Sequence, residues 1–170
     1  MKMQMRFFAG KVIDDVLYFS ATMFNGLFGM KMDTGRIDFL GSFKNVPLDR
    51  VLLHRKCLTY NRWLIFIPQN AGWIHLVHAD SLEQTAIKVA DDGKYFYFAD
   101  AVIWGDSLYL LPGKKEQQAL IVDLKDLRVE PINSLNEFIK KEVPDSPEIV
   151  SILFRKFIFA ARLQAVIRPA

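Results

Sequence analysis

Three histidines are the first residues in this chain that could carry chemistry, because a neutral imidazole is a common metal ligand and general base. His75 and His78 lie three residues apart in an apolar segment typical of a strand. Side chains three apart on a strand point to opposite faces, so these two are not placed to share a metal ion. His54 stands alone among apolar residues. We expect surface or satisfied core histidines and no metal site.

The single cysteine, Cys57, follows Arg55 and Lys56, and neighbouring cations can lower the pKa of a thiol. It also lies in an apolar segment with no assured base nearby, so we expect a buried, inert thiol. A lone cysteine excludes an internal disulfide and favours a reducing compartment.

Two acidic pairs, Asp14-Asp15 and Asp91-Asp92, could be considered as paired catalytic carboxylates. Adjacent side chains on a strand point apart, and Asp92 precedes Gly93, a strong hairpin signal. Both pairs therefore favour turns. The sequence contains no Gly-x-Ser-x-Gly elbow, phosphate-binding loop or dinucleotide fingerprint. We assign no catalytic residue and expect no cofactor.

Three tryptophans, Trp63, Trp73 and Trp104, could stack on sugars or bases. Two of them lie within apolar strand segments, and this placement favours packing in the core.

Charge and hydropathy argue against two classes of partner. The net charge of +3 is spread along the chain without the basic face that nucleic-acid binding requires. The most apolar stretch, residues 149–167, is interrupted by Arg155, Lys156 and Arg162, and it falls short of the roughly 20 apolar residues of a membrane helix. The first ten residues lack the apolar run of a secretory signal. We expect a cytoplasmic protein that binds neither nucleic acid nor membrane.

The elements that must position these residues form an internal repeat. A polar turn followed by an apolar strand occurs three times, with anchor leucines 47 and 44 residues apart at Leu17, Leu64 and Leu108. A second apolar strand follows each anchor and meets an aspartate at a turn. These aspartates, Asp33, Asp80 and Asp123, lie 16, 16 and 15 residues beyond the anchors.

Return strands follow these turns, and apolar lead-ins precede the anchors at residues 7–8, 51–53 and 101–104. The inner strands are predicted at residues 16–20, 26–32, 63–67, 72–78, 107–111 and 119–123. Four strands in roughly 45 residues match one propeller blade. The sequence thus predicts an all-β partial β-propeller, with about three four-stranded antiparallel blades and the start of a fourth.

The order of apolar strand, glycine, apolar strand, Asp-x-Gly turn and return strand resembles the propeller superfamily that includes kelch-like and quinoprotein-like repeats. Asp33-Thr34-Gly35 resembles the quinoprotein-type turn, which the later units replace with Asp80-Ser81-Leu82 and Asp123-Leu124-Lys125. The resemblance covers most of residues 5–161. It implies a scaffold, and such scaffolds host unrelated functions.

In propellers the ligand face is commonly built by the loops that join second to third strands. Here these loops are residues 22–25, 69–71 and 113–118. Asn25, Gln69 and Asn70 are the polar residues that we select there as ligand contacts. The alternative is that they serve only the turns.

The chain is expected to form a single repeat array over residues 1–170, with units at 5–41, 50–90 and 95–132. An incomplete unit is expected at 148–161, with a variable tail to 170. Pro147 and Ser146 leave open a helix there instead, and a capping box at Ser134 predicts a short helix over 135–142. Three and a half blades do not close, so the chain is expected to be a piece of a longer protein or to self-associate through open blade edges.

Two functions remain. The first is a non-catalytic binding or protein-interaction module, with a protein or small-molecule ligand of unspecified identity. The second is a fragment of a propeller enzyme whose active site lies at the blade axis.

Overall fold

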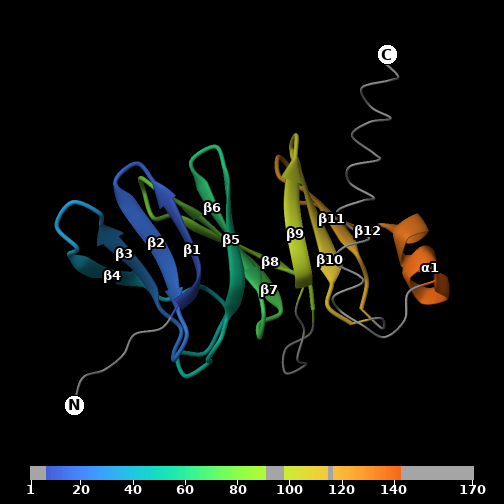
Figure 1. The fold of residues 1–170 in the computed structure, drawn as a ribbon, viewed down its shortest axis with the longest axis horizontal. Helices are drawn as coiled ribbons and strands as arrows, with labels where there is room; N and C mark the ends of the chain where they lie inside the picture. Colours follow the sequence, from blue (N-terminus) through green and yellow to red (C-terminus); the bar gives the residue numbers. More distant parts are fainter. Residues whose placement is uncertain (1–6, 91–97, 115–116, 143–170) are drawn as a thin grey trace. The chain divides into compact units, whose positions relative to one another are not determined.

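A computed structural model of the chain describes residues 7–90, 98–114 and 117–142. The chain divides into two compact units, Met1–Tyr97 and Phe98–Ala170. The described strands form three separate sheets, each of four strands in an antiparallel arrangement (Figure 1). The predicted all-β fold is confirmed.

The first unit holds two sheets. Sheet 1 comprises β1 (Phe7–Ile13), β2 (Val16–Ala21), β3 (Leu27–Lys31) and β4 (Ile37–Gly41). Sheet 2 comprises β5 (His54–Tyr60), β6 (Trp63–Pro68), β7 (Trp73–His78) and β8 (Gln84–Lys88). The strands of each sheet are adjacent in chain order, as in a meander.

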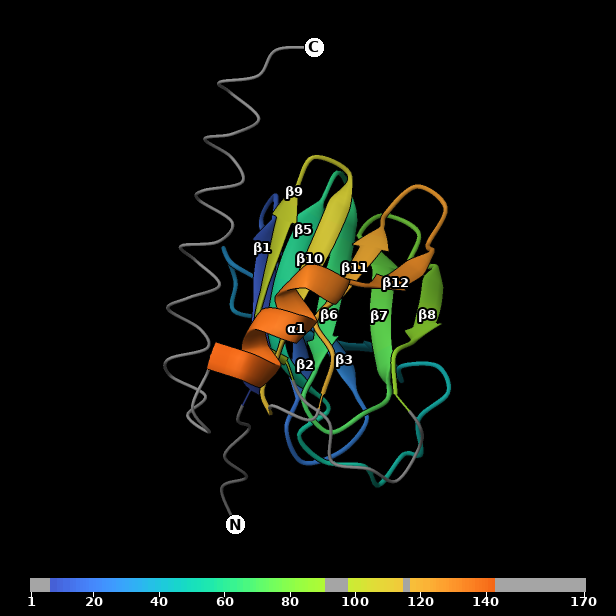
Figure 2. The ribbon, with the colours of Figure 1, turned by 90° about the vertical axis from the view of Figure 1, so that its right-hand side faces the viewer.

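The second unit holds sheet 3 and one helix. Sheet 3 comprises β9 (Phe98–Trp104), β10 (Ser107–Pro112), β11 (Leu120–Asp123) and β12 (Val129–Pro131). The helix α1 (Asn133–Glu142) begins two residues before the predicted start. Figure 2 shows α1 across sheet 3, where Leu135 and Ile139 pack against Leu111 and Ala119.

The repeat is visible in the backbone of the turns. The first residue of each turn between first and second strands has a positive φ, at Asp14, Asn61 and Gly105. A second positive φ recurs between third and fourth strands, at Gly35, Leu82 and Leu127. Because L-residues with side chains rarely adopt this conformation, its recurrence at the same position shows that the three blades share one turn geometry.

The core of the first unit lies between sheets 1 and 2. Tyr18 and Leu27 from sheet 1 pack there with Leu64, Phe66 and Val77 from sheet 2. Leu64 and Leu108 are fully buried, whereas Leu17, the anchor of the first blade, is only half-buried. The second strand of the first blade is therefore covered less completely at its anchor than the second strands of the other two blades.

Two predictions need correction. The lead-in at residues 51–53 is not a strand, because Leu52 has a φ of 52° and its amide donates to the Thr22 carbonyl, so β5 begins only at His54. The three tryptophans are half-buried and lie outside the fully buried core. Trp63 packs edge-on against His78, and the Lys88 ammonium lies over the Trp73 ring.

Several further predictions fall outside the described residues. These are the Asp91-Asp92 turn, part of the 113–118 loop, and the incomplete unit at 148–161 with its helical alternative. They stay predictions.

Candidate binding site at the loop end

Three connections of the first unit emerge at one end of its sheets, because antiparallel strands reverse direction at every turn. They join β2 to β3, β4 to β5 and β6 to β7, and they lie at the lower end of the first unit in Figure 1. We call this end the loop end, and the opposite end, which carries the short turns, the turn end.

Asn25 holds two of these connections together. Its side chain is 1% exposed, and its Nδ2 donates to the carbonyls of Phe43 and Val46 at 2.9 and 2.8 Å. The Phe43 amide donates to Asn25 Oδ1 at 2.8 Å. The amide group of Asn25 thus binds the β4–β5 connection and faces away from solvent.

Gln69 and Asn70 tie the β6–β7 loop to the same connection. The Gln69 amide donates to the Leu53 carbonyl at 2.8 Å, and Asn70 Nδ2 donates to the Val51 carbonyl at 3.3 Å. Both residues are half-exposed. The structure therefore brings all three predicted residues to one end, with Gln69 and Asn70 reaching its surface. Their binding role stays a prediction.

Exposed apolar side chains accompany these residues. Met23 in the β2–β3 loop and Leu48 in the β4–β5 connection are 68% and 64% exposed, and Val51 is also exposed. Their segments are joined by backbone hydrogen bonds from Asn25 to Leu48 and from Leu52 to Thr22. We call Met23, Leu48 and Val51 the loop-end patch. Sequence reasoning missed this patch because it selected only polar residues, and only from the loops between second and third strands, whereas Leu48 and Val51 lie in the β4–β5 connection.

A buried chain of hydrogen bonds runs beneath the loop end. Ser20 Oγ lies 2.9 Å from His54 Nδ1, His54 Nε2 lies 2.8 Å from His75 Nδ1, and His75 Nε2 lies 2.8 Å from the Lys44 carbonyl. The carbonyl can only accept, so His75 carries its proton on Nε2 and accepts on Nδ1. His54 must then donate from Nε2 and accept from the Ser20 hydroxyl. His54 and His75 are thus buried histidines whose ring nitrogens are hydrogen-bonded, as the sequence led us to expect.

Burial keeps both imidazoles neutral. Desolvation, together with the neighbouring His75, holds the pKa of His54 well below 6.5. Desolvation also lowers the pKa of His75 to about 4, although the hydrogen bond to Lys44 opposes this shift. Neutral rings are what the assigned chain of donors and acceptors requires.

The order of hydroxyl, imidazole and second imidazole has the distances of a nucleophile with its base. However, Ser20 is 2% exposed and both histidines are buried, so a substrate in solvent does not reach the hydroxyl. The chain therefore links β2, β5, β7 and the β4–β5 connection as a structural network. Burial likewise raises the pKa of Cys57 to about 12, which leaves an unreactive thiol.

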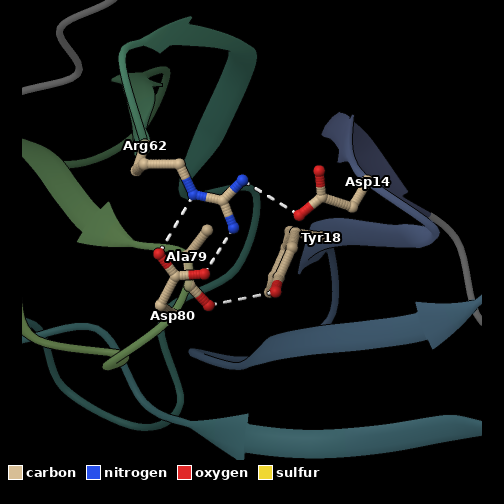
Figure 3. Close-up of polar contacts among 5 residues, drawn as sticks. All are labelled: Asp14, Tyr18, Arg62, Ala79 and Asp80. Atoms are coloured by element: carbon tan, nitrogen blue, oxygen red, sulfur yellow. Dashed lines mark hydrogen bonds and ion pairs between the residues drawn. The ribbon is translucent and has the colours of Figure 1, made fainter.

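A different polar cluster lies at the turn end (Figure 3). Arg62, in the β5–β6 turn, contacts Asp14 at 2.9 Å through Nη1 and Asp80 at 3.0 Å through Nε. The hydrogen bond to Arg62 lowers the pKa of Asp80. Beside this cluster, the Tyr18 hydroxyl donates to the Ala79 carbonyl at 3.1 Å. Asp14 thus lies in a turn, as predicted, and joins sheet 1 to sheet 2.

Among residues 7–90, 98–114 and 117–142, no group of three or more His, Cys, Asp or Glu side chains is placed to hold a metal ion. Within the same residues, no helix is long and apolar enough to cross a membrane.

Comparison with known proteins gives a match at the level of fold. No protein-family model and no curated protein sequence matches the chain. Among solved structures, the hydrazine synthase of Kuenenia stuttgartiensis superposes with a TM-score of 0.54 at 13% identity, over 74% of this chain and 34% of that one. A europium-containing methanol dehydrogenase gives 0.53 at 12% identity, over 71% and 23%.

The computationally designed protein Ika4 gives a TM-score of 0.53 at 6% identity, over 76% of this chain and 72% of that one. The chain thus spans only about a third or less of the two enzymes. These neighbours include propeller proteins, and such low identities establish the fold alone. With its three four-stranded antiparallel sheets, the chain has the fold of a partial β-propeller of about three blades.

Proposed function

We propose that this chain is a non-catalytic binding module that takes a protein segment with apolar side chains at its loop end. The observation that carries the proposal is the loop-end patch. Apolar side chains that gather on a surface are a feature of protein–protein contacts, and methionine adapts well to different partner surfaces.

The construction of the loop end supports this role. Asn25 and the backbone hydrogen bonds between the loops hold Met23 and Leu48 on ordered connections. A surface that is ordered before binding loses less conformational entropy when its partner docks. The half-exposed amides of Gln69 and Asn70 would add hydrogen bonds at the rim of the patch, where interfaces are polar.

A propeller enzyme is the other function that such a scaffold could serve, and the fold does not decide between them. The Ser20–His54 pair has the chemistry of a catalytic pair but is enclosed in the protein. The loop-end patch, by contrast, is accessible. We propose the cytoplasm as the compartment, because Cys57 is a free thiol and free thiols are typical of reducing compartments.

The test uses peptides selected from a random library against the purified full chain. We expect selected peptides to bind the wild type and to lose about tenfold in affinity, or about 1.4 kcal/mol, against Met23→Ser/Leu48→Ser. Met32→Ser is the matched control, because Met32 is also an exposed methionine, at 52%, and lies at the turn end. Failure to select any peptide, or equal loss in the control, would contradict the proposal.

A further inference from the structure

Sheet 1 has a second face, opposite to the one that packs on sheet 2, and this face is apolar across all four strands. The strand register places two rows of residues on it. One row is Val12, Leu17, Met30 and Ile37, and the other is Gly10, Phe19, Phe28 and Phe39. We call these eight residues the outer face. It contains no charged or polar side chain.

The middle of the outer face is tightly packed and its margins are open. Phe28 stacks on Phe19 with ring centroids 5.6 Å apart and contacts Phe39 at 5.3 Å. Phe39 and Ile37 on β4 are nevertheless 57% and 47% exposed, and Val12 on β1 is 46% exposed. A soluble monomer rarely leaves large apolar side chains aligned on one sheet face.

The face of sheet 2 at the same positions of the repeat shows what such a face packs against. One of its rows is Thr59, Leu64, Val77 and Gln84, and the other row is Cys57, Phe66, His75 and Ala86. Sheet 1 covers this face, and Cys57, Leu64, Phe66 and Val77 belong to the shared core. The outer face holds the same positions one blade earlier, so its chemistry fits an apolar sheet rather than a polar ligand.

Compared with its equivalent, the outer face is more apolar at the edge. Phe39 and Ile37 stand where sheet 2 has Ala86 and Gln84. An edge that simply faced solvent would gain nothing from these replacements. Large apolar residues at the margin instead widen the area that an apposed sheet can bury, at about 25 cal/mol for each Å² of apolar surface.

Two other described sheet faces are covered within their own unit. The face of sheet 2 that carries Leu64 packs on sheet 1, and one face of sheet 3 packs against α1 through Leu111. The outer face, by contrast, exposes the large apolar side chains of Val12, Ile37 and Phe39. It is therefore the face that we assign to contact with a second copy of the chain.

We propose that two copies of this chain pair outer face to outer face about a twofold axis that runs along the strands. Such an axis places β4 of one copy over β1 of the other and keeps the rows aligned. The Phe39 ring then lies over Gly10, which has no side chain, and Ile37 lies over Val12. Large residues on one edge and small ones on the other make the face complementary to itself.

Sedimentation of the purified full chain at micromolar concentrations tests the proposal. We expect a species of twice the 19.6 kDa chain mass, and Ile37→Ser/Phe39→Ser should shift it to the monomer. Met23→Ser/Leu48→Ser is the control and should remain dimeric, since it alters only the loop-end patch. Peptide binding and dimerisation are thus measured on different variants, so a failure of one proposal can be told apart from a failure of the other.

Cross-linking tests the geometry. Val12 and Ile37 are three strands apart in one sheet, which separates them by about 14 Å at 4.8 Å per strand. A bis-maleimide whose spacer is shorter than this separation cannot join cysteines at the two positions within one chain. In a Val12→Cys/Ile37→Cys variant we expect that reagent to produce covalent dimers. A wild-type monomer would show that the face is covered within the chain and would overturn the proposal. A dimer that survives Ile37→Ser/Phe39→Ser would overturn it too.

Discussion

Ser20, His54 and His75 come from three different strands, and each accepts or donates the hydrogen bond that the next one needs. The Lys44 carbonyl fixes the direction of the whole chain, because a carbonyl has no proton to give. A proton added to Nδ1 of His75 would face the Nε2 donor of His54, which places two donors against each other. A proton added to Nδ1 of His54 would reverse the bond with Ser20, whose hydroxyl can also accept. The network therefore makes the first unit sensitive to acid.

We predict that the stability of the first unit falls as the pH drops from about 6.5 towards 4. In this window the unfolded state binds protons at His54 and His75, whereas the folded state, with lowered pKa values, does not. The loss is about 1.4 kcal/mol per histidine at pH 5.5. Urea unfolding at pH 7.5 and 5.5 measures it.

His75→Gln provides the control for this measurement. Glutamine keeps a donor and an acceptor but cannot titrate, so about half of the pH dependence should disappear. Equal stability of the wild type at the two pH values would contradict the assigned network.

This network could not have been predicted from the sequence. His54 is 21 residues from His75 and 34 from Ser20, and the contacts depend on how β2, β5 and β7 come together. Sequence reasoning placed Ser20 and His75 on predicted strands, left His54 outside them, and correctly expected the thiol of Cys57 to be buried. Which buried polar groups meet is decided by tertiary packing.

At the level of elements, the sequence carried most of the information. The six predicted inner strands are all present within two residues of their expected ends, because alternating and continuous apolar runs mark strands between turns. Asp33-Thr34-Gly35 forms the expected turn, with the Thr34 amide donating to Asp33 and Gly35 at a φ of 67°.

The errors in the fold prediction have a common cause. Residues 51–53 have the composition of a strand, but the positive φ of Leu52 and its bond to Thr22 make them part of the loop end. The tryptophans are apolar enough for the core, yet their positions in the sheets leave them half-exposed. In both cases contacts between segments override local composition.

Two asparagines at the loop end provide a matched pair for a stability prediction. Asn25→Asp replaces the donor that serves Phe43 and Val46 by a second acceptor, and each buried carbonyl left without a donor costs about 1–3 kcal/mol. Asn70→Asp removes one long bond at the surface and should cost far less. Urea unfolding compares the two variants.

If Asn25→Asp and Asn70→Asp were equally stable, Asn25 would not hold the loops in place. Asn25 would then be free to contact a ligand, as the sequence analysis expected, and the loop end would lack its internal support.

At the level of the whole molecule, two surfaces stand out, and they serve different purposes. The loop-end patch is small, carries amides at its rim and lies on connections between strands. The outer face is a sheet surface without polar groups, suited to another sheet. A dimer through the outer face would leave the loop end of each copy accessible, so assembly and binding can coexist.

We propose that the loop end of the first unit is the binding surface, and hydrogen exchange measured by mass spectrometry, with and without a library-selected peptide, tests this. We expect slower exchange in residues 22–25 and 43–53, with no change in the β3–β4 turn at residues 32–36. Protection confined to that turn or to the outer strands of sheet 1, with the loop end unchanged, would contradict it.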